Sequence, residues 1–394
     1  MLRILFLNHN VIGKSTYHRC LALARELTES GNQVTIITNS RTERIKFRQY
    51  TDRKVMIVEC PDLFWGSLRT GWDPMNVFRR CVYLRDKSYD IIHAFDTRPT
   101  VIIPAFFYKK FIKDIPLFID WSDWWSRGGA ISLRPHRILT TLFSPIETFF
   151  EEYFRKFAVH STVVSRLLLN RALSLGVKKE SITLLPNYAD IRNIYPENKK
   201  KARKSLNLPL NANICIYPSF VLYDFPMVLQ SFKFILSHLP GSFLILAGEF
   251  PEHFFDETSK ILIKKGIIKI VGKLDRNKLR LYLNASNVAL IPLSDTLTNN
   301  ARLPMKFGDC FAAGIPIISN KVGDIGDIIE KYNLGLLCKY SPEFIGKKVF
   351  WVFRHKKEAE KIARRAREFA ETKFSWKIGS ELMESKYKLF LVKS

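Results

Sequence analysis

At 394 residues the chain is longer than one hydrophobic core usually supports, and we therefore expect two domains. Hydrophobic residues make up 47% of the chain and charged residues 25%, an ordinary globular composition that excludes a long disordered tract. The 62 Lys and Arg residues outnumber the 37 Asp and Glu residues, so the net charge of +25 predicts an anionic ligand or surface as a partner.

The sequence also disfavours several classes of protein. Its basic residues are dispersed, with one dense run at 199–204, and neither a zinc-finger nor an RNP signature is present, so we expect no nucleic-acid partner. No uncharged apolar run reaches the roughly 20 residues that span a bilayer, and the apolar start is too short for a signal peptide. We expect a cytoplasmic protein, with peripheral contact to an anionic inner membrane face as an alternative.

Short apolar runs alternate with longer segments of helical period along the whole chain, a pattern that predicts βαβ units and parallel sheets. The strands expected in the first half are 3–7, 33–38, 55–59, 91–94, 117–120 and 161–164. Those expected in the second half are 214–217, 243–247, 268–271, 288–291 and 315–319.

A polar connection separates the two sets of strands. Leu185-Pro186-Asn187-Tyr188 precedes the polar stretch 196–204, which indicates a domain boundary near 190 to 200. We expect domains at 1–190 and 200–372, followed by a terminal helix at 373–394. Two doubly wound halves direct the carboxyl ends of their strands to a shared cleft, which predicts an interdomain site.

Gly13-Lys14-Ser15 follows the first expected strand, where a phosphate-binding turn would lie. A Walker A loop needs another glycine five positions before Gly13, but Asn8 stands there. Two interpretations stay open: an ordinary strand-to-helix turn, and a loop whose backbone N–H groups face the cleft.

The segment 304–316, PMKFGDCFAAGIP, has the pattern of a phosphate-binding helix. Pro304 suits the first helical turn, Lys306 follows where a pyrophosphate would meet the helix N-terminus, and Gly314 is placed to end the helix. Asp309 lies on a neighbouring helical face, where its carboxylate can accept hydrogen bonds from ribose hydroxyls. The alternative is a helix start with a chance lysine and aspartate.

This segment resembles the "P-x-K-L-x-E-Y-x-A-x-G-K-P" motif of family 4 of the retaining glycosyltransferases. The N-terminal half adds Gly13, Arg19 and the DIIH stretch at 90–93, and the C-terminal half adds an FSW stretch at 374–376. The resemblance implies the GT-B fold, in which two Rossmann-like doubly wound domains face an interdomain cleft. It also implies an acceptor-binding N-terminal domain, a domain that binds the nucleotide sugar, and a terminal helix that crosses back to the first domain.

The resemblance implies a set of donor-binding residues, and the match has two departures. The implied donor residues are Gly13, Gly272, Lys273, Asn299, Asn300, Arg302, Lys306 and Asp309. Ala301 stands where the family has a second glutamate, and the basic pair that usually follows the strand at 214–217 is replaced by residues such as Ser219 and Asp224. Lys306, together with Arg302, would then carry more of the donor's phosphate charge.

The acceptor site is expected after the strand at 117–120. There Asp120, Asp123 and Trp124 combine carboxylates with an aromatic face, the chemistry that binds sugar hydroxyls and pyranose C–H groups. Asp123 is the candidate for orienting the acceptor, and with Lys306 and Asp309 it forms the expected catalytic set. The alternative is that the tryptophans are core and Asp123 caps a helix. His93 is an acceptor-binding candidate and, alternatively, a structural histidine at a strand end.

A segment rich in aromatic residues, 142–157, has apolar residues at helical spacing and a polar opposite face that includes Glu147 and Glu151. Its acidic polar face favours a helix of the domain core over a membrane-binding helix. Two other clusters are membrane candidates or, equally, solvated surface: Arg41, Arg44, Lys46, Arg48, Arg53 and Lys54, and Phe106, Phe107, Lys109, Lys110 and Lys113.

The function expected from these features is transfer of a hexose-type residue from a nucleoside diphosphate sugar to a carbohydrate or lipid-linked acceptor, with retention, in cell-surface polysaccharide or glycoconjugate synthesis. The nucleoside diphosphate sugar is a substrate, and neither a tightly bound cofactor nor a metal is expected. Three alternatives stay open: a catalytically silent sugar-binding or scaffold homologue, a GT-B sugar-nucleotide epimerase, and a basic nucleic-acid binder.

Overall fold

The computed structural model describes residues 1–14, 16–63, 70–133, 137–219 and 223–391. It divides into two compact units: unit 1 is Met1–Pro186 together with Trp376–Ser394, and unit 2 is Asn187–Ser375. The division lies a few residues before the connection expected at 190 to 200.

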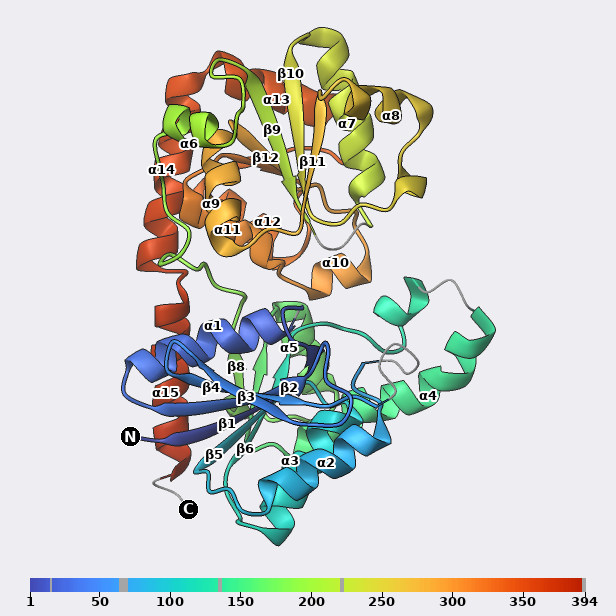
Figure 1. Cartoon of the computed structure of the whole chain (residues 1–394), viewed down its shortest axis with the longest axis vertical. Helices are drawn as coiled ribbons and strands as arrows, with labels where there is room; N and C mark the ends of the chain where they lie inside the picture. Colours follow the sequence, from blue (N-terminus) through green and yellow to red (C-terminus); the bar gives the residue numbers. More distant parts are fainter. Residues whose placement is uncertain (15, 64–69, 134–136, 220–222, 392–394) are drawn as a thin grey trace. The chain divides into compact units, whose positions relative to one another are not determined.

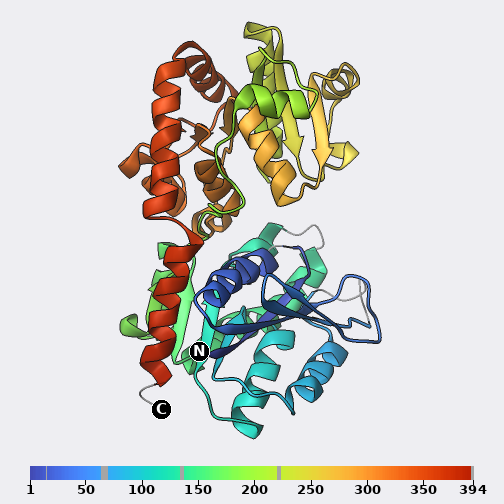
Figure 2. The ribbon, with the colours of Figure 1, turned by 60° about the vertical axis from the view of Figure 1, so that its left-hand side comes forward.

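Unit 1 is built on an eight-stranded sheet with the order β3-β4-β2-β1-β5-β6-β7-β8, parallel except for the β3–β4 pair. Its strands are β1 (Arg3–Val11), β2 (Gln33–Asn39), β3 (Arg48–Asp52), β4 (Val55–Cys60), β5 (Ile91–Phe95), β6 (Leu117–Trp121), β7 (His160–Val163) and β8 (Ile182–Leu184). Its helices are α1 (Thr16–Glu29), α2 (Pro74–Leu84), α3 (Pro99–Phe111), η1 (Ala130–Leu133), α4 (Arg137–Tyr153), η2 (Phe154–Phe157), α5 (Arg166–Ser174), η3 (Lys179–Ser181) and α15 (Trp376–Leu391). The helices α1 and α15 pack together, as do α2 and α3 (Figures 1 and 2).

Unit 2 has a six-stranded parallel sheet with the order β11-β10-β9-β12-β13-β14. Its strands are β9 (Asn213–Pro218), β10 (Ser242–Ala247), β11 (Ile268–Gly272), β12 (Val288–Leu290), β13 (Ile317–Ser319) and β14 (Leu336–Leu337). Its helices are α6 (Lys199–Ser205), α7 (Phe225–His238), η4 (Glu252–Phe254), α8 (Glu257–Lys264), α9 (Arg276–Ala285), α10 (Leu297–Ala301), α11 (Met305–Ala313), α12 (Gly323–Tyr332), α13 (Pro342–Arg354) and α14 (Lys356–Thr372).

The predicted fold class, two doubly wound α/β domains with parallel sheets, is confirmed. Each predicted strand is present, and most of its apolar residues are buried because helices pack on the sheet, with Met56 and Ile270 on strands near the sheet edges as exposed exceptions. Three strands escaped prediction. The residues of β3 are polar and pair only at the sheet edge, β8 has three residues, and β14 has two.

The C-terminal helix α15 is part of unit 1, although the whole of unit 2 precedes it in sequence. Tyr387 is buried, and its hydroxyl lies 2.7 Å from Nδ1 of His93 on β5. Its ring also packs edge-on against Phe118 of β6, with 4.8 Å between centroids. The helix therefore completes the core beside the central strands.

The predicted packing of α4 is wrong for most of its apolar face. We expected this face to be core, but six of its side chains are exposed: Leu142, Phe143, Ile146, Phe149, Tyr153 and Phe157. Phe150 and Phe154 are half-buried and do pack against the core of unit 1. The polar residues Glu147 and Glu151 are buried instead. The periodicity identified the helix correctly, but it could not show that its polar groups have partners inside the unit.

Candidate functional site

In unit 2, a cationic cluster lies at the start of α11, close to residues that follow β9 and β12. Pro304 is the N-cap of α11 and provides no side-chain cap, so the first backbone N–H groups of the helix lack an intrahelical partner. Lys306 lies in the first turn, and Gly314 ends the helix in the left-handed conformation with φ +62°. The role of Gly314 as terminator is confirmed, whereas Pro304 precedes the helix as its N-cap and is not part of the first turn.

The amine of Lys306 is unusual because little in its surroundings favours its positive charge. Its Nζ lies 4.8 Å from the centre of the Tyr217 ring, and it has no hydrogen-bond partner among the described residues. Burial, together with the charge of Arg302, lowers the pKa of Lys306 to about 7, and Asp224 only partly opposes these effects. A nearby anion would restore the ammonium form.

Arg302 is held beside Lys306 by its neighbours on α10. Its guanidinium donates to Oδ1 of Asn299 at 2.5 Å and lies 4.0 Å from a carboxylate oxygen of Asp224. Its Nε–H is buried and has no acceptor among the described residues. Two cations and one carboxylate thus share this cluster, and one buried donor is left over for a ligand.

Asp224 and Asn299 form the support beneath these cations. The Asp224 carboxylate accepts from the backbone N–H of Ser294, from Nδ2 of Asn299 and from the hydroxyl of Tyr340. Asn300, also on α10, accepts from the backbone N–H of Gly323 through Oδ1 at 2.9 Å. The sequence departure at Asp224 therefore has a structural role, because this carboxylate fixes the loop after β12.

Asp309 does not join the cluster around Lys306. Its two carboxylate oxygens accept from the guanidinium of Arg276 at 2.7 and 3.1 Å, and Arg276 also bonds Asp190 at 3.1 Å. Although burial opposes its charge, the two carboxylates raise the pKa of Arg276 above its ordinary value. The expected ribose ligand is thus part of a three-membered ion-pair network, and any hydroxyl it binds must share its oxygens with Arg276.

The remaining donor candidates occupy loops. Gly272 ends β11 with φ +69°, a conformation that glycine adopts without strain, and Lys273 follows it. Gly13 lies in unit 1, in the turn between β1 and α1, with φ +74°, and its carbonyl is 2.9 Å from Nε2 of His18. Ser15, the last residue of the Gly13-Lys14-Ser15 turn, lies outside the described residues.

Unit 1 has a cavity of about 170 Å³ at the carboxyl ends of β1, β5 and β6. This is the edge at which doubly wound sheets bind ligands. The lining is mostly polar, and it consists of His9, Asn10, Thr16, Asp96, Arg98, Ser122, Asp123 and Trp125.

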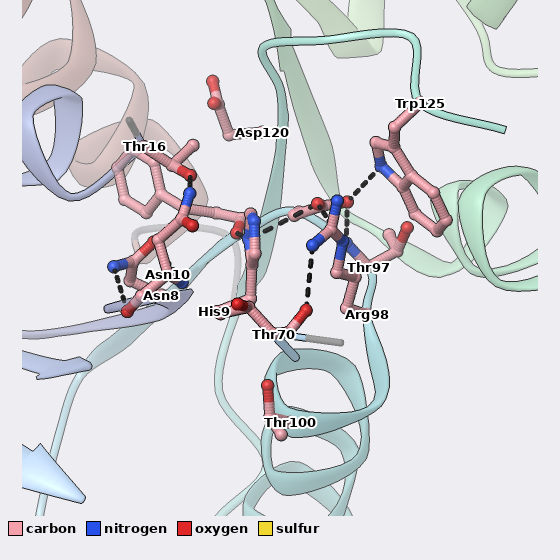
Figure 3. A network of polar contacts seen from close by, with 12 residues as sticks. Asn8, His9, Asn10, Thr16, Thr70, Thr97, Arg98, Thr100, Asp120 and Trp125 are labelled. Atoms are coloured by element: carbon pink, nitrogen blue, oxygen red, sulfur yellow. Dashed lines mark hydrogen bonds and ion pairs between the residues drawn. The ribbon is translucent and has the colours of Figure 1, made fainter. Parts of the chain in front are cut away.

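Asp96 organises the lining of this cavity. Its Oδ1 accepts from the indole N–H of Trp125 at 2.8 Å and from the backbone N–H of Thr97, while Oδ2 lies 3.3 Å from Nε of Arg98 and 3.4 Å from Nδ1 of His9. Figure 3 shows His9, Arg98 and Trp125 converging from three segments. Burial alone would raise the pKa of Asp96, but the charges of His9 and Arg98 hold it below its ordinary value.

The backbone at Asp96 is strained, with φ +91° for a residue that has a side chain. Strain of this kind persists where surrounding contacts over-determine the conformation, and it concentrates at binding and catalytic sites. The four partners of the Asp96 carboxylate supply those contacts.

The predicted acceptor residues are only partly brought together. Asp123 lines the cavity and is exposed. Trp124 does not line it, because its indole donates to the carbonyl of Arg127 and Arg171 stacks on its ring at 3.9 Å. The neighbouring Trp125 supplies the aromatic wall.

Asp120 and His93 are buried away from the cavity. Asp120 is paired with Arg19 through two hydrogen bonds of 2.8 and 2.9 Å, and Thr162 also donates to it at 2.5 Å. Figure 3 accordingly shows Asp120 apart from the network around His9. His93 lies between Thr162 and Tyr387, and burial lowers its pKa to about 3, so it is neutral at physiological pH. These positions support structural roles for both residues.

Sequence reasoning missed His9, Asp96 and Arg98 in unit 1 and Arg276 in unit 2. The first three do carry a signal, because each follows the end of a predicted strand where ligands bind. Arg276 carries none, since its partners Asp190 and Asp309 lie far from it in sequence. Among the described residues no group of three or more His, Cys, Asp or Glu side chains is placed to hold a metal ion, and no helix is long and apolar enough to cross a membrane.

The fold is shared with solved GT-B glycosyltransferases. Sucrose-phosphate synthase from Thermosynechococcus elongatus is 16% identical, with a TM-score of 0.76 and complete coverage of both chains. Anabaena HepE, solved in complex with UDP and glucose, is 15% identical with a TM-score of 0.69, over 98% of this chain and 100% of that one. WaaG, a glycosyltransferase involved in lipopolysaccharide biosynthesis, is 12% identical with a TM-score of 0.66, over 98% of this chain and 99% of that one. The class is therefore GT-B.

Two family matches cover most of the sequence. Residues 18–193 match Glycosyltransferase Family 4, and residues 198–369 match Glycosyl transferases group 1. The chain belongs to this glycosyltransferase family and is an enzyme of the glycosyltransferase class. The predicted family membership is confirmed. No curated protein matches the sequence.

Proposed function

We propose that the chain transfers a hexose-type residue from a nucleoside diphosphate sugar to a hydroxyl of a carbohydrate or lipid-linked acceptor, with retention of anomeric configuration. The observation that carries the proposal is the cluster at the start of α11, which places the basic side chains of Lys306 and Arg302 beside one carboxylate and leaves a buried Arg302 N–H with no acceptor among the described residues. WaaG, which shares the fold, acts in lipopolysaccharide biosynthesis, and this supports a role in cell-surface polysaccharide or glycoconjugate synthesis.

The cationic cluster suits the donor's diphosphate. Negative charge develops on the leaving phosphate as the bond to the sugar breaks, and fixed cations stabilise that charge best where water is scarce. Lys306 would gain a proton as it pairs with the phosphate, and the first N–H groups of α11 would add hydrogen bonds. Asn299 and Asn300 hold α10 beside them, and the loop of Gly272 and Lys273 is the proposed contact for the nucleoside.

The cavity in unit 1 suits a sugar acceptor. Asp123 is exposed at its wall and can accept a hydrogen bond from an acceptor hydroxyl, while Trp125 lines the wall as a buried side chain with Arg98 over its ring. Asp96 and His9 add a second polar pair in the same cavity. We propose this cavity as the acceptor site, with Asp123 and Asp96 as its hydroxyl-orienting carboxylates.

The proposed reaction exchanges one carbon–oxygen bond for another on one face of the sugar. The bond from the anomeric carbon to the phosphate oxygen breaks, the acceptor oxygen bonds to the same carbon, and the acceptor's proton passes to the departing phosphate. This route needs no covalent nucleophile on the protein, and its main demand is stabilisation of the leaving diphosphate. Proton NMR of the product tests retention through the anomeric coupling constant.

The donor claim is tested by thermal-shift and calorimetric titration with UDP, ADP, GDP, CDP and dTDP. HepE has been solved with UDP, which makes UDP the first probe. We expect one nucleotide to stabilise the protein, because a ligand of the native state shifts unfolding by mass action. Lys306→Ala should abolish this shift. Lys331→Ala, which removes another lysine that lies over a tyrosine ring, should leave it unchanged.

The acceptor claim is tested separately with Asp123→Asn and Asp96→Asn. Both variants should bind the nucleotide like the wild type and lose transfer to the acceptor by about 100-fold, because a misplaced acceptor hydroxyl no longer lies in line with the anomeric carbon. Equal nucleotide shifts for the wild type and Lys306→Ala would overturn the donor site. Unchanged transfer by both aspartate variants would overturn the acceptor site.

A further inference from the structure

The outward face of α4 and η2 is apolar and aromatic. Its six large side chains are between 41% and 67% exposed, and they recur at the spacing of one helical face. We call this set the α4 face, and it consists of Leu142, Phe143, Ile146, Phe149, Tyr153 and Phe157. Contiguous exposed apolar patches of this kind mark interaction sites on soluble proteins.

Hydrogen bonds on the opposite side of the helix fix this orientation. The buried carboxylate of Glu151 accepts from the indole N–H of Trp121 and from the backbone N–H groups of Trp125 and Ser126, all at 2.8 to 3.0 Å. Arg155 is also buried, donates to the carbonyl of Asp120, and lies 3.8 Å from the centre of the Trp121 ring. Rotating the helix to bury its apolar face would break these contacts, so the α4 face stays outward.

Basic residues lie at the edge of the α4 face. The Nζ of Lys156 is 4.1 Å from the centre of the Tyr153 ring and 5.3 Å from that of Phe157. The neighbouring helix α3 meets this end through Phe106, whose ring packs against Phe157 at 5.8 Å. Further along α3, Phe111 is exposed beside Lys110, which lies 5.4 Å from its ring. Exposed aromatic rings with adjacent ammonium groups therefore continue onto α3.

We propose that the α4 face docks on the surface of an anionic lipid bilayer, with its apolar side chains in the boundary between headgroups and acyl chains. Aromatic and aliphatic side chains on one helix face, with lysines beside them, are the chemistry of interfacial helices. The chain's net charge of +25 adds attraction to acidic headgroups.

Charge also separates this occupant from a second copy of the chain. Two copies that each carry a charge of +25 repel one another, whereas an acidic bilayer attracts each copy. The α4 face has lysines at its edge, so pairing two such faces would bring like charges together. This inference does not rest on the proposed transfer reaction, and nucleotide binding by unit 2 reports on that reaction independently.

The test is flotation of the full chain with vesicles of phosphatidylcholine alone or of phosphatidylcholine and phosphatidylglycerol in a 7:3 ratio. We expect the wild type to float with the anionic vesicles only, and to bind less as salt is raised. The variant Phe143→Ser/Ile146→Ser/Phe149→Ser should bind more than about tenfold more weakly, because it keeps every charge and removes three apolar side chains that are 48% to 51% exposed. The control Leu210→Ser/Ile261→Ser/Phe344→Ser removes similarly exposed side chains from unit 2 and should bind like the wild type.

A second readout reports insertion. Phe149→Trp should gain fluorescence that brominated phosphatidylcholine quenches in anionic vesicles, whereas Phe344→Trp should not. Equal flotation of the α4-face variant and the wild type would overturn the proposal, since binding would then follow net charge alone. Dimers in size-exclusion light scattering that the α4-face variant abolishes, with no vesicle binding, would assign the face to a second copy and also overturn it.

Discussion

Lys306 lies at the N-terminus of α11, in surroundings that disfavour its positive charge. Burial and Arg302 lower its pKa to about 7 from an ordinary value of 10.5. Without ligand, the unfolded chain holds this proton between those two values and the folded chain does not, so the contribution of Lys306 to stability improves as pH rises from 7 towards 10.5. An anionic ligand reverses this preference, because it favours the charged form.

We therefore predict that binding of the nucleoside diphosphate takes up nearly one proton at pH 8. The affinity for the nucleoside diphosphate should fall as pH rises above about 7, because Lys306 must then take its proton from a solution with fewer free protons. Calorimetry in two buffers with different ionisation enthalpies measures the uptake. Lys306→Arg, whose guanidinium stays charged, is the matched control, and the same uptake by both proteins would contradict the prediction.

The sequence predicted that the Asp309 carboxylate accepts hydrogen bonds from ribose hydroxyls, and it did not reveal that Arg276 donates to both carboxylate oxygens. The position of Asp309 on α11 follows from sequence spacing, whereas Arg276 comes from the start of α9, and the two are joined only by the packing of unit 2. No periodicity in a single sequence reveals a pairing of this kind.

The network predicts an order of stabilities. Arg276→Met should cost more than Asp309→Asn, because removing the arginine leaves both Asp309 and Asp190 without their shared cation. We expect about 1–3 kcal/mol for Arg276→Met, since the network is partly open to solvent. Denaturant unfolding measures both values. If Asp309→Asn lowers the free energy of unfolding more than Arg276→Met does, Arg276 does not act as the bridge between Asp309 and Asp190.

At the scale of elements, apolar periodicity located strands and helices well and the packing of α4 badly. A parallel strand covered on both sides must be apolar, so its pattern has one interpretation. The pattern of an amphipathic helix has two interpretations, with the apolar face inward or outward. Which one holds depends on whether the polar side chains find buried partners. Glu151 accepts from three N–H donors outside its own helix: the indole N–H of Trp121 at the end of β6 and the backbone N–H groups of Trp125 and Ser126 in the loop that follows.

Glu151 therefore connects α4 to the loop that carries Asp123, and its substitution should affect both. Glu151→Gln places an amide N–H among three donors, and we expect a loss of about 1–3 kcal/mol in the free energy of unfolding, together with weaker acceptor-dependent transfer. Nucleotide binding in unit 2 should be unchanged. Glu152→Gln, the neighbouring substitution at a half-buried pair with Arg171, should cost less than about 1 kcal/mol. Equal costs would contradict the assignment.

At the scale of the whole molecule, the alternation of strands and helices was enough to predict two doubly wound units, because each βαβ unit is a local pattern. The two sites were harder, because residues from several strand ends converge in each. The cavity around Asp96 draws on β1, β5 and β6, and its strained backbone has no counterpart in a sequence motif.

Truncation after Ser375 tests the contribution of α15 to unit 1. Trp376, Met383 and Tyr387 are all buried, and a large buried apolar side chain contributes about 2 kcal/mol, so unit 1 should unfold at a clearly lower temperature. Calorimetry should then show two transitions, of which only the one from unit 2 rises with nucleotide. A single transition at the wild-type temperature would show that α15 adds little to unit 1.

The place of α15 also sets an order for folding during synthesis. The ribosome makes the strands of unit 1 first, but the helix that covers His93 and Phe118 emerges only after all of unit 2. The ribosome adds about 5–20 residues per second, and domains usually fold in the order in which they are made. Here unit 1 cannot be completed until the last helix has been made. At those rates the apolar surface that α15 will cover stays exposed for roughly ten seconds or more. A chaperone that binds nascent chains has its longest opportunity at that surface.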